Sequence, residues 1–552
     1  MLKCKSSFFI LLACYGLTAS TQTLLPRQID SLLSKYDTDH QPGLAISVIK
    51  NNNILYSKGF GAANLDYSIK NTDSTVFSLA SVSKQFTSAA IWSLINEKKL
   101  SLDDNIHNFF TDFPEYAKTI KIKHLLNHTS GFRNYHTLMY LSGFNYDRDY
   151  YDNQTILNLI KQQKNLDNPL GEKVVYSNTN YNILALIIEK LSNQNLDDYL
   201  KDKVLLPLEM KGTFVRISHG KIIKNKAVGY QKKNNQFTYN TTSQLSYGAG
   251  SMGSHLNDMI IWLKMLNGQI PQFKSLASFL KTQDALINGE TANYARGLMI
   301  DDYKGYEVAS HSGFGYGGQS QLITVPEEKI GVIIMTNLQS INPIPLSYQI
   351  LDMLLISEEK ESKETNKSII FTPQNFVQFV GDYREINSDM TMHISKENDT
   401  LKAKGSMGKR PIPLLQSDKN LFVRLNAQNV KYDFTKTDKH DMTVSFGGTP
   451  FYFKRADIST KTPSDLCNYA GSYFSEELKT TYTFTIENNT IMLSYPNHKD
   501  IKLHPVELDK FGNNDRTLYH FTVNSEGQVN GMLLSCDGQV SNIEFIKDRT
   551  PN

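Results

Sequence analysis

The sequence predicts an α+β fold, in which a mixed sheet covered by helices is followed by two small β domains, barrels or sandwiches. Three observations lead to this prediction. Strand-like runs enclose a series of helical stretches in the first part of the chain. A charged, Ser-rich stretch from Ser357 to Lys367 then separates that part from the rest. Beyond it, short alternating runs dominate, and two motifs recur at one constant offset.

Length and charge set broad limits on the function. With 552 residues, the chain exceeds what one hydrophobic core usually serves, which predicts two or three domains. Its 58 Lys and Arg residues nearly balance 55 Asp and Glu residues, and no basic stripe with interleaved aromatic residues stands out. We therefore expect no nucleic-acid partner, and a small molecule or peptide as substrate.

Residues 1–21 have the three-part order of a secretory signal peptide. Two lysines precede an apolar run from Phe8 to Leu17, and small residues follow it. The sequence therefore predicts a secreted or periplasmic protein. The run is shorter than the roughly 20 residues that span a bilayer, so no permanent transmembrane anchor is expected. Lipid anchoring at Cys14 is the alternative, although apolar residues continue past that cysteine.

The first domain is expected over residues 22–356. It begins with a hairpin of Leu44 to Lys50 and Ile54 to Phe60, joined by three asparagines. It ends with strands Gln319 to Val325 and Ile330 to Met335, joined by a turn at residues 326–329. The helices expected in between are Thr155 to Gln163, Asn180 to Leu191, and Asn257 to Leu266 with Ser254 as its cap.

A linker over residues 357–369 leads to two similar β domains, over residues 370–457 and 461–552. The run Gly381-Asp-Tyr383 recurs as Gly471-Ser-Tyr473, and residues 397–401 recur as residues 487–491, both at an offset of 90 positions. Two matches at one offset indicate a duplicated domain. Cys467 and Cys536 both lie in the second copy. They are candidates for a disulfide, with two buried thiols as the alternative.

Ser81 and Lys84 are the candidate nucleophile and its partner. They open an apolar stretch without Gly or Pro that predicts a helix to about Leu100. Residues three apart on a helix are neighbours, and the N–H groups of a first helical turn favour negative charge. This pairing activates a serine without a Ser-His-Asp triad, and it therefore indicates acyl transfer.

Two further motifs support this chemistry. Tyr176-Ser-Asn178 precedes a helical run, and its phenol and amide could meet Ser81. His311-Ser-Gly313 precedes a strand and offers an edge that approaches a substrate closely. The three motifs, in this order and spacing, resemble the serine hydrolase family of class C β-lactamases, DD-peptidases, D-aminopeptidases and related esterases. Supporting stretches are residues 42–46, 122–131 and 248–253.

The resemblance implies covalent catalysis with roles for individual residues. Ser81 would attack a carbonyl and form an acyl-enzyme, while Lys84 and Tyr176 share the proton transfers, with Tyr176 as principal base. The charge state of the lysine stays open. Asn178 would orient Lys84 and the substrate, and the backbone N–H groups of Ser81 and Phe314 would form the oxyanion hole. No cofactor and no metal are expected, and His124 and His128 are interpreted as packing or capping residues.

The third motif departs from the pattern of the β-lactamases, which usually carry Lys-Thr-Gly there. His311 takes the place of the lysine, and an imidazole is mostly neutral at pH 7, which weakens the anchor for a substrate carboxylate. Together with Gly313, His311 resembles the D-aminopeptidase and esterase branches. D-Aminopeptidase also joins its catalytic domain to two C-terminal barrels. The resemblance thus implies a β-lactamase-like domain, an antiparallel sheet with helices, followed by two small lipocalin-like β-barrels.

Three functions follow from these patterns. The first is an exported serine hydrolase that acts on D-amino-acid peptides, amides or esters, with weak reactivity toward β-lactams. The second is a class C-like β-lactamase or DD-peptidase that acts on β-lactams or peptidoglycan. The third is a non-catalytic penicillin- or wall-binding protein that has kept the pocket, against which the three intact motifs speak. Association with the cell wall is open in all three.

Overall fold

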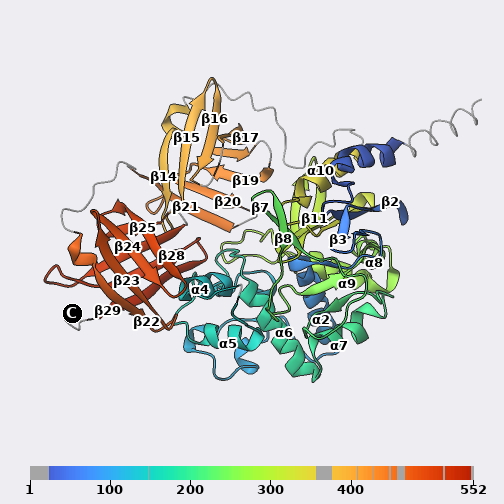
Figure 1. The fold of residues 1–552 in the computed structure, drawn as a ribbon, viewed down its shortest axis with the longest axis horizontal. Helices are drawn as coiled ribbons and strands as arrows, with labels where there is room; N and C mark the ends of the chain where they lie inside the picture. Colours follow the sequence, from blue (N-terminus) through green and yellow to red (C-terminus); the bar gives the residue numbers. More distant parts are fainter. Residues whose placement is uncertain are drawn as a thin grey trace, which may run out of the picture.

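The computed structural model describes residues 24–146, 148–355, 376–406, 408, 410–424, 427–446, 449–456, 466–513 and 516–548. It consists of a domain of sheet and helices and two closed β-barrels (Figure 1). The expected signal peptide, the alternative anchor at Cys14 and the expected linker over residues 357–369 lie outside the described residues.

Six strands form the central sheet, in the order β10-β11-β12-β13-β1-β2. Their bounds are β1 Leu44–Lys50, β2 Asn53–Phe60, β10 Met299–Tyr303, β11 Tyr306–Gly315, β12 Gly318–Val325 and β13 Ile330–Thr336. Every neighbouring pair is antiparallel. The sheet is therefore antiparallel, as the family resemblance implies, and not mixed. Both predicted hairpins are confirmed.

Helices cover both faces of this sheet, which explains why β1 is almost continuously apolar. Ala45 and Ile49 face the core that contains the larger set of helices. The alternate residues Leu44, Ile46 and Val48 face a second core, together with a helix over residues 24–33 and α10 (Pro343–Leu354). A strand has a side-chain period of two, so this alternation places β1 between two apolar layers.

The remaining helices of the first domain lie mainly between β2 and β10 in the sequence. They are α2 Lys84–Asn96, α3 Ile122–Leu126, α4 Tyr135–Ser142, α5 Asn153–Lys161, α6 Asn178–Ser192, α7 Leu196–Leu200, α8 Leu256–Leu266 and α9 Lys274–Lys281. Short helical turns are η1 Ser34–Tyr36, η2 Ala80–Ser83, η3 Ile106–Asn108, η4 Glu115–Ala117, η5 Lys201–Leu205, η6 Pro271–Phe273 and η7 Pro326–Glu328. Small strands are β3 Ala62–Asn64, β4 Ile69–Lys70, β5 Phe77–Ser78, β6 Phe214–Val215, β7 Tyr230–Lys233, β8 Gln236–Tyr239 and β9 Met252–Ser254.

Two helix ends differ from the prediction. The helix after Ser81 ends at Asn96 and not near Leu100, because Lys98 adopts a left-handed conformation with φ of 57° that stops the helix. The cap of α8 is His255, whose Nδ1 accepts a hydrogen bond from the backbone N–H of Asp258. The predicted cap, Ser254, instead ends strand β9 and pairs with Phe77.

The two barrels have eight strands each. The first contains β14 Gly381–Glu385, β15 Thr391–Glu397, β16 Thr400–Gly405, β17 Ile412–Gln416, β18 Leu421–Arg424, β19 Ala427–Asp433, β20 Met442–Phe446 and β21 Thr449–Arg455, preceded by η8 Phe376–Phe379. The second contains β22 Gly471–Ser475, β23 Thr480–Glu487, β24 Thr490–Tyr495, β25 His498–Glu507, β26 Lys510–Gly512, β27 Thr517–Val523, β28 Val529–Cys536 and β29 Val540–Lys547, preceded by η9 Cys467–Tyr469.

The internal repeat corresponds to equivalent positions in the two barrels. Tyr383 and Tyr473 lie in the first strand of each, and both hydroxyls donate to the carbonyl oxygen four residues earlier, at 2.9 Å. Gly381 and Gly471 have φ of 149° and 131°, a region that residues with a Cβ rarely adopt. The spacing of 90 positions therefore reflects repeated local geometry and not chance similarity.

The candidate disulfide between Cys467 and Cys536 is not formed, and the alternative of two buried thiols holds only for Cys536. Cys467 is exposed at the start of η9, whereas Cys536 is buried at the end of β28, and no disulfide joins them. The Cys536 thiol lies 3.4 Å from the hydroxyl of Thr517 on the neighbouring strand. One sulfur lies at the surface and the other inside the barrel, so shared membership of one domain does not bring them together.

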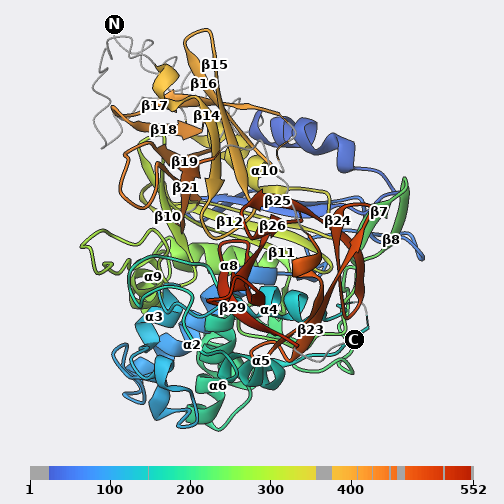
Figure 2. The ribbon, with the colours of Figure 1, turned by 90° about the vertical axis from the view of Figure 1, so that its left-hand side faces the viewer.

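The second barrel packs against α4 and α5, as Figures 1 and 2 show. Glu477 of the barrel forms a buried ion pair with Arg133, at 2.6 Å between Oε2 and Nη1. The Tyr482 hydroxyl donates to the carbonyl oxygen of Leu141 at the end of α4. Side chains of the barrel and of the first domain share one continuous apolar core. The barrel is thus an integral part of the fold around α4.

Candidate active site

Ser81 lies in η2, the short turn that joins strand β5 to helix α2. The backbone N–H of Leu79 donates to the carbonyl oxygen of Met252 at 2.9 Å, which ties this turn to β9. Ala80, directly before Ser81, has φ of 45°, a left-handed conformation that costs about 1–2 kcal/mol for a residue with a Cβ. The sharp turn leaves Ser81 partly exposed while the following residues are buried.

Lys84 is the first residue of α2 and is fully buried. Its Nζ lies 3.1 Å from Oγ of Ser81, 2.8 Å from Oδ1 of Asn178 and 2.8 Å from the carbonyl oxygen of Ala249. Burial lowers the pKa of the Lys84 amine well below its ordinary value, and no carboxylate in the described part of the chain opposes this shift. Two carbonyl acceptors and one hydroxyl therefore surround an amine that burial drives toward its neutral form.

Tyr176 and Asn178 come from the start of α6. The Tyr176 phenol lies next to the side chain of Ser81, and its ring centroid lies 4.8 Å from Nζ of Lys84. Burial raises the pKa of the Tyr176 phenol above its ordinary value, so the phenol is neutral at pH 7. The structure thus brings the first two sequence motifs together around one serine hydroxyl.

His311 lies on β11, behind this cluster. Its Nδ1 lies 2.6 Å from the carbonyl oxygen of Ser312 and its Nε2 lies 2.9 Å from the hydroxyl of Tyr294. The first contact requires a proton on Nδ1, so Nε2 accepts from Tyr294. Burial lowers the pKa of His311 to about 3, and Lys84, whenever its amine is protonated, lowers it further. The imidazole is neutral, and it is not one of the side chains that line the pocket in front of Ser81.

Gly313 brings the edge of β11 against the turn that carries Ser81. Strand β10 pairs with β11 only as far as Ser310, so the edge from residue 311 to 315 has no strand on that side. A Cβ at Gly313 would lie 2.4 Å from the carbonyl oxygen of Leu79 and 3.0 Å from the Cβ of Ala80. Only a glycine permits this approach. Phe314, on the same edge, lines the pocket with Ser81, as an oxyanion-hole residue must.

Replacing Gly313 by alanine is expected to lower kcat by up to about 10²-fold, because the added methyl group forces the β11 edge away from Ser81. Gly315→Ala is the matched control, since a Cβ there meets only the Cβ of Ala80 at 3.5 Å, an ordinary contact. Steady-state kinetics with an ester substrate measures both. Equal kcat in the two variants would contradict a functional role for this close approach.

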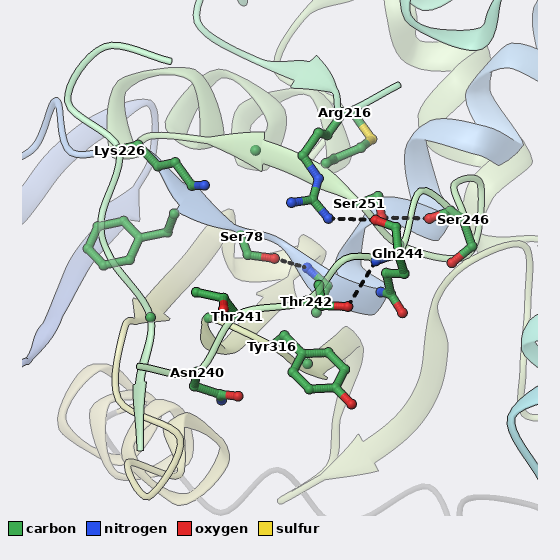
Figure 3. Close-up of a pocket in the computed structure, with 18 of the residues that line it drawn as sticks. Ser78, Arg216, Lys226, Asn240, Thr241, Thr242, Gln244, Ser246, Ser251 and Tyr316 are labelled. Carbon is green, nitrogen blue, oxygen red and sulfur yellow. Dashed lines mark hydrogen bonds between the residues drawn. The ribbon is translucent and has the colours of Figure 1, made fainter. Parts of the chain in front are cut away.

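A pocket of about 460 Å³ opens in front of Ser81. Its lining comes from η2, from Asn178, from the small sheet β5-β9-β6 with the segments after it, and from the β11-β12 turn. Figure 3 shows part of this lining, with Arg216 and Lys226 directed into the hollow. Sequence reasoning missed Arg216, Lys226 and Tyr294, because no motif marks them. Ala249 lies in the stretch 248–253, which the resemblance singled out without assigning it a contact.

The two histidines of the 122–131 stretch have structural contacts. Nδ1 of His124 accepts from the backbone N–H of Lys121 at the start of α3, and Nδ1 of His128 accepts from the backbone N–H of Ser177. The ring of His128 also packs 4.4 Å from that of Tyr176. The interpretation as capping and packing residues is confirmed.

Within the described residues, no group of three or more His, Cys, Asp or Glu side chains is arranged to hold a metal ion. The described residues also contain no helix that is both long and apolar enough to cross a membrane.

Comparison with known proteins agrees with this geometry. The Beta-lactamase family matches residues 29–347. Protein flp from Staphylococcus aureus strain MW2 is 27% identical over 348 residues, which cover 61% of this chain and 68% of that protein. A D-aminopeptidase from Brucella canis is 26% identical over 299 residues, covering 54% of this chain and 57% of that enzyme.

Among solved structures, an octameric penicillin-binding protein homologue from Pyrococcus abyssi is similar in fold, with a TM-score of 0.53 at 21% identity. The similarity covers 84% of this chain and 97% of that one. The family match extends over more than half of the chain and contains all three motifs around Ser81. The chain therefore belongs to the Beta-lactamase family of serine hydrolases.

Proposed function

We propose that this protein hydrolyses D-amino-acid peptides, amides or esters through an acyl-enzyme at Ser81. The observation that carries the proposal is the position of the Ser81 hydroxyl, 3.1 Å from the buried amine of Lys84 and next to the phenol of Tyr176. The similarity to a D-aminopeptidase supports the substrate class. The same mechanism serves peptides, amides and esters, because each presents a carbonyl carbon to the serine.

In the proposed mechanism, Lys84 and not Tyr176 removes the proton from Ser81. Asn178 and Ala249 supply two carbonyl acceptors for the N–H groups of a neutral amine, and its lone pair is then directed at the Ser81 hydroxyl. The raised pKa of Tyr176 disfavours a phenolate base, so the phenol keeps a proton and can only relay to the leaving group the proton that Lys84 has taken from Ser81. This reverses the assignment that the sequence motifs alone favour.

The oxyanion hole is proposed at the backbone N–H groups of Ser81 and Phe314. After Ser81 attacks the carbonyl carbon, the negative oxygen would lie between η2 and the β11 edge, which Gly313 allows to approach closely. The leaving group departs with a proton, and water then attacks the acyl-enzyme. Each backbone donor in such a site is worth about 10²- to 10³-fold in rate.

Hydrolysis of β-lactams is proposed only as a slow side reaction. His311 is neutral and directed at Tyr294, so it supplies no positive charge where the Lys-Thr-Gly lysine of β-lactamases would lie. The proposal also includes export, which rests on the signal-like residues 1–21.

Intact mass measurement tests the proposed function. The protein is incubated with a D-alanyl amide, a D-Ala-D-Ala peptide, a short-chain ester and a penicillin, while product release is followed in parallel. We expect turnover of the amide or ester, and a long-lived adduct with the penicillin, both absent in Ser81→Ala. If the unmodified protein gives neither turnover nor an adduct with any of these compounds, the proposal fails.

A further inference from the structure

The pocket in front of Ser81 has an unbalanced charge. Its lining includes three cationic residues, Arg216, Lys221 and Lys226, and two histidines. None of the described residues that line it is an aspartate or glutamate. A chain with nearly equal numbers of acidic and basic residues has no general excess of positive charge, so this local excess is a property of the pocket.

Among the described residues, only one of the three cations forms an ion pair with a carboxylate. Lys221 lies 3.2 Å from Oδ2 of Asp197, an oxygen that Lys201 also contacts at 2.5 Å. Arg216 donates from Nη2 to the carbonyl oxygen of Gln244 at 3.0 Å, which is a neutral acceptor. Among the described residues, no carboxylate shifts the pKa of Arg216 or of Lys226.

Both cations are anchored by the backbone next to the nucleophile. The N–H of Arg216 donates to the carbonyl oxygen of Ser251 at 2.8 Å, directly after strand β6. Lys226 forms a β-bridge with Val76, and the N–H of Ala227 donates to the carbonyl oxygen of Val76 at 2.9 Å. Val76 precedes β5, the strand that leads to Ser81. The backbone positions that carry the two positive groups are therefore fixed relative to the reacting serine.

The arrangement is electrostatically unfavourable without a negative group. Arg216 is half-buried, and burial lowers its pKa. Lys226 is exposed at the mouth of the pocket, yet partial desolvation and then the charge of Arg216 lower its pKa. Figure 3 shows the two side chains pointing into the same hollow from two sides. An anion between them would replace repulsion by two charge-assisted contacts.

We infer that Arg216 and Lys226 form a binding site for an anionic group of the substrate, a carboxylate or a phosphate, beside Ser81. The inference rests on the proposed function and narrows its substrate class to anionic D-amino-acid derivatives. The planar guanidinium suits two oxygens of one oxyanion, and the ammonium supplies a second positive charge. Arg216 and Lys226 would thus supply, from a different wall of the pocket, the positive charge that is missing at His311.

Binding to the inactive Ser81→Ala protein tests the inference without requiring turnover. Isothermal titration compares three probes: D-alanyl-glycine with a carboxylate, D-alanyl-aminomethylphosphonate, and the neutral D-alanyl-glycinamide. We expect both anionic probes to bind about tenfold or more tightly than the amide, and this preference to weaken as salt is added. A larger preference for the phosphonate identifies a phosphate as the natural group, and a larger one for the glycine probe a carboxylate.

Variants in the Ser81→Ala background locate the site. Arg216→Gln and Lys226→Gln should each reduce the preference for anionic probes about tenfold. Lys224→Gln is the matched control, because this exposed lysine lies in the same segment, loses the same charge and does not line the pocket. Equal binding of the neutral and anionic probes, or equal effects of Lys224→Gln and Lys226→Gln, would overturn the inference. If the anionic probes bind, but the unmodified protein gives no turnover and no adduct with these probes or with the amide, peptide, ester and penicillin named above, the anion site stands and the proposed function fails.

Discussion

Lys84→Met is expected to lower the rate of Ser81 acylation by about 10²- to 10⁴-fold, the usual contribution of a general base. Methionine is unbranched and close to lysine in shape, so the fully buried site stays filled. The hydroxyl of Ser81 remains in place but loses its proton acceptor. Burst kinetics with a chromogenic ester measures the acylation step directly.

The pH dependence of acylation in the same variant distinguishes a lysine that acts as a neutral base from a lysine with only a structural role. Because burial lowers the pKa of Lys84, its active neutral fraction should rise as pH increases, along a limb centred below the ordinary lysine value of 10.5. Lys84→Met should lack this limb. It should also lose less stability as the pH falls below 10.5, because the unfolded chain binds a proton at Lys84 more readily than the folded chain does. A variant that keeps both the acylation rate and the pH limb would exclude Lys84 as the base. Tyr176→Phe is the matched comparison, and we expect it to keep the limb.

Glu477→Gln is expected to destabilise the protein by about 3–5 kcal/mol, because it leaves Arg133 buried without its counter-charge. The effect should reach the active site. The carbonyl oxygen of Arg133 accepts from the Thr179 hydroxyl at 2.8 Å, and the N–H of Tyr135 donates to that hydroxyl at 3.0 Å. Thr179 directly follows Asn178. We therefore expect a lower thermal midpoint together with a lower kcat/KM.

A neighbouring glutamate gives the control for this prediction. Glu476 is exposed and pairs with Lys479 three residues later, so Glu476→Gln should leave the thermal midpoint nearly unchanged. Differential scanning calorimetry and limited proteolysis of the second barrel compare the two variants. Equal midpoints would mean that the buried ion pair does not hold the barrel to the first domain.

Local patterns predict much of the fold because they depend on neighbouring residues. The hairpins at β1-β2 and β12-β13 follow from period-two alternation and turn residues, and the two barrels follow from a repeat visible in the sequence. The end of α2 at Asn96 is not predictable in this way, since a lysine in left-handed conformation carries no composition signal. The cysteine pairing fails for a similar reason, because it depends on which side of a barrel wall each residue occupies.

The candidate site also contains some residues that sequence motifs predict and others that only the tertiary structure reveals. Ser81, Lys84, Tyr176 and Asn178 belong to motifs, and the structure brings their side chains together. The acceptor at Ala249 is a backbone atom, which no residue identity reveals. Arg216 and Lys226 are ordinary cations in the sequence. Their importance appears only when the pocket lining is assembled and found to lack acidic residues.

The position of β1 in the central sheet constrains how the chain folds. Leu44 pairs with Thr336, and Lys50 pairs with Ile330, although nearly the whole first domain separates them in sequence. Such distant contacts raise the entropic cost of loop closure and slow folding. During synthesis, the β1-β2 hairpin is made long before β13, so the edge of β1 that pairs with β13 stays uncovered until then. We therefore expect this hairpin to be the segment that chaperones need to protect.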